Sequence, residues 1–339
     1  MIELRDDSLS FSFPDVHKDA RLTIHFHRTL RIPDDGRDWP LPPGIGSFPL
    51  RKVDDFAELA PKPWLAHGGV MLPMYQAEAM WLSFDSDDIA GHDVPYPFAI
   101  QIAAGKINAA SGEPWSDTLV AEPQSYLVVP EQPWLDGFCV EKGIIRQFVA
   151  MPLGSGYSAE EQLTGKAEHG GLQILVRPMQ RAEFDRRFPK QPGRRRHMAM
   201  GDVCCASPCS PDMGLGAGGR MRQSIESDPY GVDAWDTARS KCFVHLANAL
   251  VWHAITGQHP PHPPPTAATY SRSGLPWFDW YDEHSKPIDG TQVLALLKSI
   301  RQLGAEKGQV PLPENEAVPP ERIVALQRKT PHQIREGAF

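Results

Sequence analysis

Hydrophobic and polar residues alternate near the start of the chain in the way that half-buried β-strands require. Residues 8–13 read SLSFSF, and further on Leu22, Ile24 and Phe26 alternate with polar or charged residues. Successive side chains of a strand point to opposite faces, so a period of two predicts strands with one face in a core. We therefore expect the chain to begin with paired strands.

The same pattern recurs further along the chain. Residues 98–107 predict a β-hairpin, and the apolar segments 143–153 and 170–179 predict an antiparallel pair of strands. The insert between those two segments places Ser158 three residues before Glu161, which is the spacing of a helix capping box. We expect one or two helical turns there.

Helical signals are concentrated near the C-terminus. Residues 241–257 predict a strand followed by a helix that Asn248 caps. Residues 288–308 have the clearest helical period and predict one helix with Asp289 as its cap. The expected core face of that helix consists of Val293, Leu296, Leu297, Ile300 and Leu303.

Proline interrupts the chain throughout. There are 34 prolines in 339 residues, and the pair Pro-Trp occurs at 63–64, 114–115, 133–134 and 276–277. Proline cannot continue a central ladder, and an indole ring buries a large apolar area. The pairs therefore predict strand ends that are fixed to the core by tryptophan.

These patterns predict an α+β fold that is mainly antiparallel β and sandwich-like, with a few C-terminal helices. We expect a β-rich body over residues 1–180 and a basic linker over 181–200. A smaller α+β part over 201–309 either stands alone or shares the same core, and a proline-rich tail follows over 310–339.

The charge and the cysteine content exclude some functional classes and favour one cellular location. The net charge of -8 argues against general nucleic-acid binding, because such affinity comes from neutralising phosphates with lysine and arginine. The sequence predicts no membrane helix and no signal peptide. The five cysteines are an odd number without a disulfide pattern, which favours a cytoplasmic location. The sequence does not predict an oligomeric state.

The segment 204–223 has the highest density of reactive and anion-binding residue types. Its glycines predict a loop whose amides approach an anion, and the arginines that follow supply guanidinium groups for the same purpose. A flexible glycine loop without a ligand is the alternative interpretation. The predicted anion-binding residues are Gly214, Gly216, Gly218, Gly219, Arg220 and Arg222.

Thiols and imidazoles in this region suggest two further kinds of chemistry. His197, Cys204, Cys205 and Cys209 have the donor atoms of a zinc site, although their spacing fits no common zinc motif. Alternatively, Cys209 is a nucleophile with His245 or His253 as its base, if folding brings the base close to the thiol. Small buried cysteines without any reactivity are the third interpretation.

Two other segments contain functional residue types. Asp279 lies among aromatic residues in the segment 275–283, which suits a sugar- or cation-binding face or an acid in catalysis. A structural aromatic strand explains the same pattern. The proline-rich segment 259–265 predicts a polyproline II stretch that serves either as a recognition element or as a connector.

The sequence therefore supports two functional hypotheses. The first is a soluble enzyme that acts on a small anionic substrate at residues 204–223, with Cys209, His245 and Asp279 as catalytic candidates. The second is a non-catalytic module for binding a protein or a glycan, or for assembly, which uses aromatic and proline-rich surfaces. Familiar signatures such as H-E-x-x-H, G-x-S-x-G and C-x-x-C are absent from the sequence.

Overall fold

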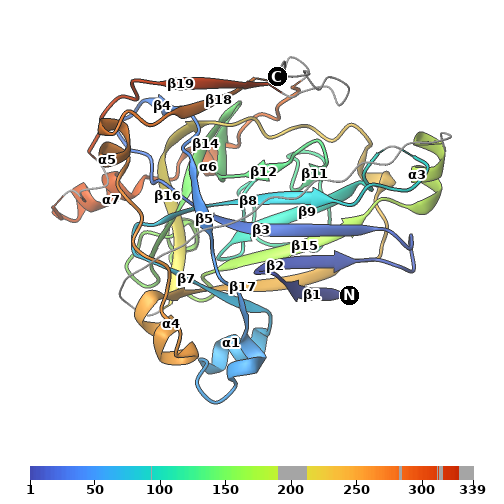
Figure 1. Cartoon of the computed structure of the whole chain (residues 1–339), viewed down its shortest axis with the longest axis horizontal. Helices are drawn as coiled ribbons and strands as arrows, with labels where there is room; N and C mark the ends of the chain where they lie inside the picture. The colour runs from blue at the N-terminus through green and yellow to red at the C-terminus, as the bar shows by residue number, and fades with distance from the viewer. Residues whose placement is uncertain (93, 190–211, 282–284, 311, 313–315, 328–339) are drawn as a thin grey trace, which may run out of the picture.

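A computed structural model describes residues 1–92, 94–189, 212–281, 285–310, 312 and 316–327, and over these residues the chain is mostly β-sheet (Figure 1). The helices are short and lie around the sheets. No helix within the described ranges is long and apolar enough to cross a membrane.

The first sheet is antiparallel except where its last two strands, β16 and β4, run parallel. Its strand order is β1 (Ile2–Arg5), β2 (Ser8–Ser12), β3 (Arg21–Thr29), β8 (Ala79–Ser86), β14 (Ile144–Pro152), β16 (Met213–Arg222) and β4 (Asp38–Trp39), with β5 (Gly44–Ser47) on β3, β12 (Trp134–Leu135) on β8 and β13 (Gly137–Glu141) on β14.

The second sheet is also mainly antiparallel, with one parallel pair between β17 and β7. Its order is β10 (Ile107–Asn108), β9 (Phe98–Ala104), β15 (Leu172–Pro178), β17 (Ser240–Asn248), β7 (Val70–Met74) and β6 (Arg51–Lys52), with β11 (Leu127–Val129) on β9. Strands from beyond residue 200 therefore pair with strands from the first 180 residues in both sheets.

The remaining elements lie outside these two sheets. A small parallel sheet joins β18 (Trp277–Tyr281) to β19 (Ile323–Gln327) at the top of Figure 1. The helices are α1 (Lys62–His67), α2 (Ala159–Thr164), α3 (Arg181–Arg187), α4 (Ala249–Thr256), α5 (Ala267–Arg272), α6 (Gln292–Ala295) and α7 (Ile300–Glu306), with 3-10 turns η1 (Val53–Phe56) and η2 (Val232–Ala234).

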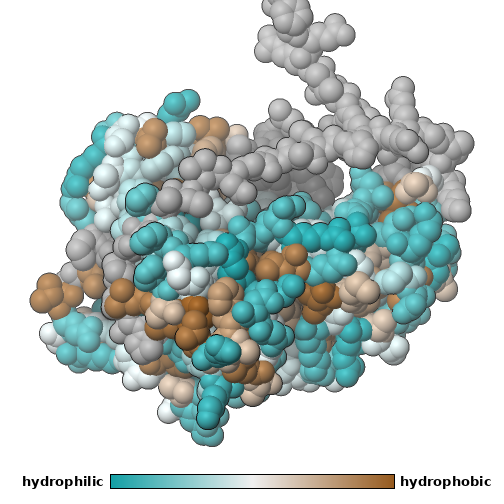
Figure 2. All heavy atoms as spheres, turned by 60° about the horizontal axis from the view of Figure 1, so that its bottom comes forward, coloured by the Kyte–Doolittle hydropathy of each residue, from teal (hydrophilic) through white to brown (hydrophobic). Residues whose placement is uncertain are grey.

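One large hydrophobic cluster contains side chains from both main sheets, such as Phe26 of β3 and Ile174 of β15. A smaller cluster lies under α1 and α4 and includes Trp64 and Trp252. Leucines remain exposed near the same two helices, at 62% for Leu59 and 49% for Leu250. Figure 2 brings that end of the molecule forward and shows hydrophobic side chains among polar ones there.

Several local predictions are confirmed. Leu22, Ile24 and Phe26 point into the core from β3, and β9 and β10 form the expected hairpin. The capping box at Ser158 begins α2. Asn248 ends β17 and accepts a hydrogen bond from the Leu250 amide at the start of α4.

Two predictions about larger units are wrong. The segments that form β14 and β15 do not pair, since β14 joins β16 and β8 while β15 joins β9 and β17. The expected helix over 288–308 is two short helices, because Ser299 starts α7 with its own capping box. Thr291, and not Asp289, caps α6, and Leu296 is 78% exposed.

The tryptophans of the four Pro-Trp pairs divide into two groups. Trp64 and Trp277 are buried, whereas Trp115 and Trp134 are half-buried. Trp277 begins β18 and Trp134 begins β12, as expected for strand ends, whereas Trp64 lies in α1. Two of the four tryptophans are buried and two begin a strand, and Trp277 alone among the four meets both expectations.

Candidate functional site

The glycine segment predicted as a loop is strand β16, which pairs with β14 along its length. An added Cβ would lie 2.7 Å from the Tyr157 carbonyl oxygen at Gly216, and 2.6 Å from the Pro33 carbonyl oxygen at Gly219. Other parts of the chain therefore approach the β16 backbone too closely for a side chain. The glycines serve packing within the protein, and the prediction of a loop is wrong.

The arginines that follow the glycines bind carboxylates of the protein itself. Arg220 donates from Nε to Asp38 Oδ1 at 2.7 Å and from Nη2 to Glu141 Oε2 at 2.8 Å. Arg222 lies 3.0 Å from Asp279, measured from Nη2 to Oδ1. Two of the predicted site residues, Arg222 and Asp279, thus come together as an ion pair. Anion binding at these arginines stays a prediction.

His245 is buried on β17. Its Nε2 atom lies 3.0 Å from the carbonyl oxygen of Gly68, and its ring stacks on Phe243 with centroids 4.3 Å apart. Burial lowers the pKa of His245 to about 4, so the imidazole is neutral at pH 7. Its contacts within the described residues do not include Asp279, whose ion-pair partner is Arg222.

The residues of the predicted zinc site and the predicted nucleophilic thiol lie outside the described part of the chain. They are His197, Cys204, Cys205 and Cys209. Elsewhere, Cys139 and Cys242 are buried, and burial raises the pKa of both thiols to about 12. Over the described ranges, no three His, Cys, Asp or Glu side chains are arranged to hold a metal ion.

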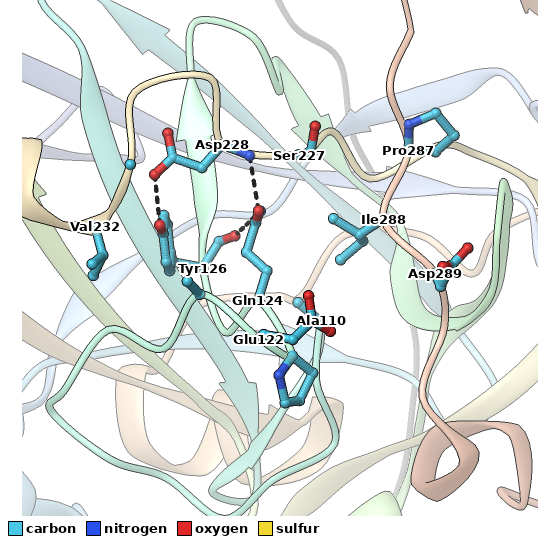
Figure 3. A pocket seen from close by; sticks show the side chains of 13 residues that line it. Ala110, Glu122, Gln124, Tyr126, Ser227, Asp228, Val232, Pro287, Ile288 and Asp289 are labelled. Atoms are coloured by element: carbon cyan, nitrogen blue, oxygen red, sulfur yellow. Dashed lines mark hydrogen bonds between the residues drawn. The ribbon is translucent and has the colours of Figure 1, made fainter.

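A surface hollow of about 340 Å³ has no residue of β16 in its described lining, and we call it the acidic hollow. Its described lining includes the carboxylates of Glu122, Asp228 and Asp289 together with the aromatic ring of Tyr126. Figure 3 shows Asp228 and Tyr126 on one side of the hollow and Asp289 on the other, with Ile288 between them. None of the described residues that line it is a lysine, arginine or histidine.

Three separate segments of the chain build the walls of the acidic hollow. Residues 121–126 lead into β11, and a short bridge joins Ala121 to Gln124. Residues 225–228 run antiparallel to 286–289, with the Ile288 amide donating to the Ile225 carbonyl at 2.8 Å. Backbone pairing between distant segments thus positions Asp228 and Asp289.

Gln124 links the first wall to the second. Its Nε2 donates to the Glu226 carbonyl at 3.0 Å, and its Oε1 accepts from the Asp228 amide at 2.8 Å, as Figure 3 shows in part. Gln124 is itself buried. A buried amide with both ends bonded rigidifies the wall that holds Asp228.

Asp228 is held by donors from three directions. Its Oδ2 accepts from the Tyr126 hydroxyl at 2.6 Å and from Trp235 Nε1 at 3.1 Å, and its Oδ1 accepts from the Tyr230 amide at 2.7 Å. Burial and the bond to Asp228 raise the pKa of Tyr126, so its hydroxyl stays protonated and donates. Asp228 therefore contributes charge to the hollow in a fixed position.

The other two carboxylates are more accessible. Glu122 is exposed, and the Asp289 side chain is 83% exposed. Lys142 Nζ lies 3.3 Å from Asp289 Oδ1, which partly neutralises that charge. Val232, Pro123 and Ile288 line the same hollow with apolar surface. This combination suits a group that has a positive head and an aliphatic stem.

The sequence predictions did not identify this site. Glu122, Asp228 and Asp289 lie in three loops separated by up to 167 positions, and no local motif joins them. Asp289 was expected to cap a helix, and the other residues have no distinguishing pattern around them. Only the pairing of distant segments brings them together.

Comparisons with family models, with curated proteins and with solved structures find no match to this chain.

Proposed function

We propose that this chain is a non-catalytic binding module that holds a lysine or arginine side chain of a partner protein in the acidic hollow. The observation that carries the proposal is the lining, in which three carboxylates and apolar surface occur together and no described lining residue is basic, although Lys142 pairs with Asp289 from outside the lining. A basic side chain places its methylene groups on Ile288 and Val232 and its charge near Glu122 and Asp289. The net charge of -8 adds a long-range attraction for a basic partner.

The enzyme hypothesis has less support from the described residues. Its Cys209 lies outside them, His245 contacts neither acid nor cysteine among its described partners, and Asp279 pairs with Arg222. The arginines that would hold an anionic substrate have carboxylate partners of their own. A small anionic substrate at 204–223 remains the second hypothesis.

We also infer that the two main sheets pack face to face as a sandwich-like body. The shared hydrophobic cluster supports this, because inward-facing residues of β3 and β8 in one sheet belong to the same cluster as those of β9 and β15 in the other. In this arrangement, the acidic hollow lies on loops at the rim of a rigid scaffold. Binding residues commonly occupy loops of this kind.

Fluorescence anisotropy with a labelled hexalysine peptide tests the proposal, with a neutral Gly-Ser hexapeptide as the peptide control. The double variant Glu122→Gln/Asp289→Asn is expected to weaken hexalysine binding about fivefold, because each exposed ion pair contributes up to about 1 kcal/mol. The matched control is Asp55→Asn/Glu58→Gln, which removes the same charge near η1. This control is expected to change the affinity less than twofold.

Two outcomes would overturn the proposal. Equal losses in both double variants would show that hexalysine responds only to net charge. Absence of any hexalysine binding at low salt would remove the acidic hollow as a site for basic side chains.

A further inference from the structure

A second hollow, of about 430 Å³, lies beside the turn that joins β2 to β3. Its walls come from residues 14–19, from residues 89–92 after β8, and from the first residue of α3, Arg181. No residue is shared between this hollow and the acidic hollow. We call it the histidine hollow, because His17 and His92 both line it.

His17 is 6% exposed, and its ring lies 5.3 Å from that of Tyr96 and 5.9 Å from that of Phe184. Its Nδ1 accepts a hydrogen bond from the Asp19 amide at 3.1 Å. The neutral ring therefore has its proton on Nε2, and among the described residues that atom has no hydrogen-bond partner. His17 thus contributes an N–H donor without a described acceptor.

His92 has the opposite arrangement. It is 5% exposed, its ring lies 4.9 Å from Phe184, and its Nδ1 lies 2.5 Å from the Phe188 carbonyl oxygen. A carbonyl only accepts, so Nδ1 has the proton and Nε2 of the neutral ring has a lone pair. Within the described part of the chain, no group donates a hydrogen bond to this Nε2. His92 thus contributes an acceptor.

The charged residues that line the histidine hollow are balanced. Lys18 and Arg181 are positive, and Asp15 and Asp19 are negative. Lys18 Nζ lies 2.9 Å from Asp19 Oδ2, so these two charges neutralise each other, and Arg181 Nε donates to Asp185 Oδ2 at 2.7 Å. Among the described lining residues, the Asp15 carboxylate and the Nη atoms of Arg181 are then the charged groups that can contact a ligand, and a ligand that has one charge of each sign matches both.

We propose that the histidine hollow binds a free α-amino acid as its zwitterion. The carboxylate of the ligand accepts from His17 Nε2 and from the guanidinium of Arg181. The ammonium group donates to His92 Nε2 and to the carboxylate of Asp15. Val16 and Ile89 line the same hollow and provide apolar surface for an aliphatic side chain.

The electrostatic surroundings of His17 are compatible with its role as a neutral donor. Burial lowers the pKa of His17, and the charge of Arg181 lowers it further. Asp19 and Asp185 act in the opposite direction, and Lys18 adds a smaller lowering effect. The ring is therefore mainly uncharged at pH 7, where an amino acid is a zwitterion.

Isothermal titration calorimetry with leucine, N-acetyl-leucine and leucinamide tests the class of ligand on the full chain at pH 7. N-acetyl-leucine retains only the negative charge, and leucinamide retains only the positive one. Leucine is expected to bind at least tenfold more tightly than either analogue. Equal binding of one analogue would overturn the zwitterion assignment, and no heat from leucine would overturn the site.

Arg181→Gln tests the location, with Arg186→Gln as its matched control on the same helix. Both arginines form an ion pair within α3, with Asp185 and Glu183 respectively, and only Arg181 lines the hollow. Arg181→Gln is expected to weaken leucine binding at least fivefold, and Arg186→Gln less than twofold. Asp15→Asn is expected to weaken leucine binding by a similar factor through the ammonium group.

Equal affinities of the Arg181→Gln and Arg186→Gln variants for leucine would show that leucine binds outside the histidine hollow. Thermal unfolding of each variant confirms that it is folded before titration. Hexalysine binding is measured in parallel, and it should be unchanged in Arg181→Gln because the acidic hollow contains none of these residues. The two proposals can therefore fail separately.

Discussion

Strand β16 and the acidic hollow both contain charged side chains, but these side chains differ in how far they are paired and exposed. In β16, glycines and arginines follow one another in sequence, but the glycines are tightly packed and the arginines are paired with carboxylates. In the acidic hollow, the charged residues come from distant loops, and two of the three carboxylates are largely exposed. A dense run of reactive residue types in the sequence therefore does not indicate how accessible those residues are or whether their charges are paired within the fold.

The contrast has a physical origin. An arginine on an interior strand has neighbouring strands on both sides, so acidic side chains of the protein can pair with its guanidinium group. Asp38 and Glu141 pair with Arg220 in this way. A loop carboxylate lacks such neighbours unless another loop supplies them. Asp228 has its donors from Tyr126 and Trp235, whereas Glu122 is left at the surface.

The largest expected effect concerns Asp136, which is 4% exposed and accepts a hydrogen bond from Gln223, the residue after β16. Burial raises its pKa to about 7, above the value of about 3.9 in an unfolded chain. A carboxyl with a raised folded-state pKa stabilises the fold fully below about pH 4, and this contribution is lost as the pH rises through 7. The loss is on the order of 4 kcal/mol.

Asp136→Asn removes this titration and keeps the shape of the side chain. Urea unfolding of both proteins at pH 4.5, 6 and 8 measures the difference in the free energy of unfolding. The wild type should lose stability relative to the variant as the pH rises. A difference that is constant with pH would mean that Asp136 is not a buried titrating group.

Gly219→Ala is expected to cost about 2–3 kcal/mol of unfolding free energy, because its Cβ would lie 2.6 Å from the Pro33 carbonyl oxygen. Gly44→Ala on β5 is the control, since its nearest contact would be Trp81 at 3.8 Å. The control should change the stability by less than about 0.5 kcal/mol. If Gly219→Ala retained full stability, the packing role of the β16 glycines would be refuted.

Asp228→Asn should lower the free energy of unfolding by about 1.5 kcal/mol, because Asp228 accepts hydrogen bonds on both carboxylate oxygens and an amide has only one acceptor oxygen. Asp233→Asn on the exposed turn η2 is the matched control and should have little effect. Chemical denaturation at pH 7 measures both. Equal stabilities of the two variants would show that the Asp228 network does not hold the wall of the hollow.

The smallest expected effect is a gain of binding. Lys142 pairs with Asp289, so Lys142→Gln should release that carboxylate and tighten hexalysine binding about twofold, which corresponds to less than 1 kcal/mol. Lys166→Gln removes the same charge near α2 and controls for net charge. An equal gain in both variants, measured by anisotropy, would argue against a direct role for Asp289.

Local features of the fold were predictable from sequence because they depend on near neighbours. The alternation in β3, the capping box at Ser158 and the cap at Asn248 each involve residues within four positions. Pairing of distant strands was not predictable in the same way. The segments of β14 and β15 resemble a hairpin in sequence, yet the insert between them carries the chain from one sheet to the other.

The helix expected over 288–308 shows a second limit of periodicity. Its apolar spacing is helical throughout, but the side chain of Ser299 bonds to the Gln302 amide and starts a new helix. The candidate site shows a third limit. Its carboxylates are ordinary loop residues in sequence, and only the pairing of residues 225–228 with 286–289 places them in one hollow.

Amide chemical-shift mapping of the 15N-labelled protein during titration with hexalysine tests most directly whether the acidic hollow binds basic side chains. If it does, the largest shifts lie in residues 121–126, 227–232 and 287–289. Shifts centred instead on β16, around Arg220 and Arg222, or spread evenly over the acidic surface, would contradict binding in the acidic hollow.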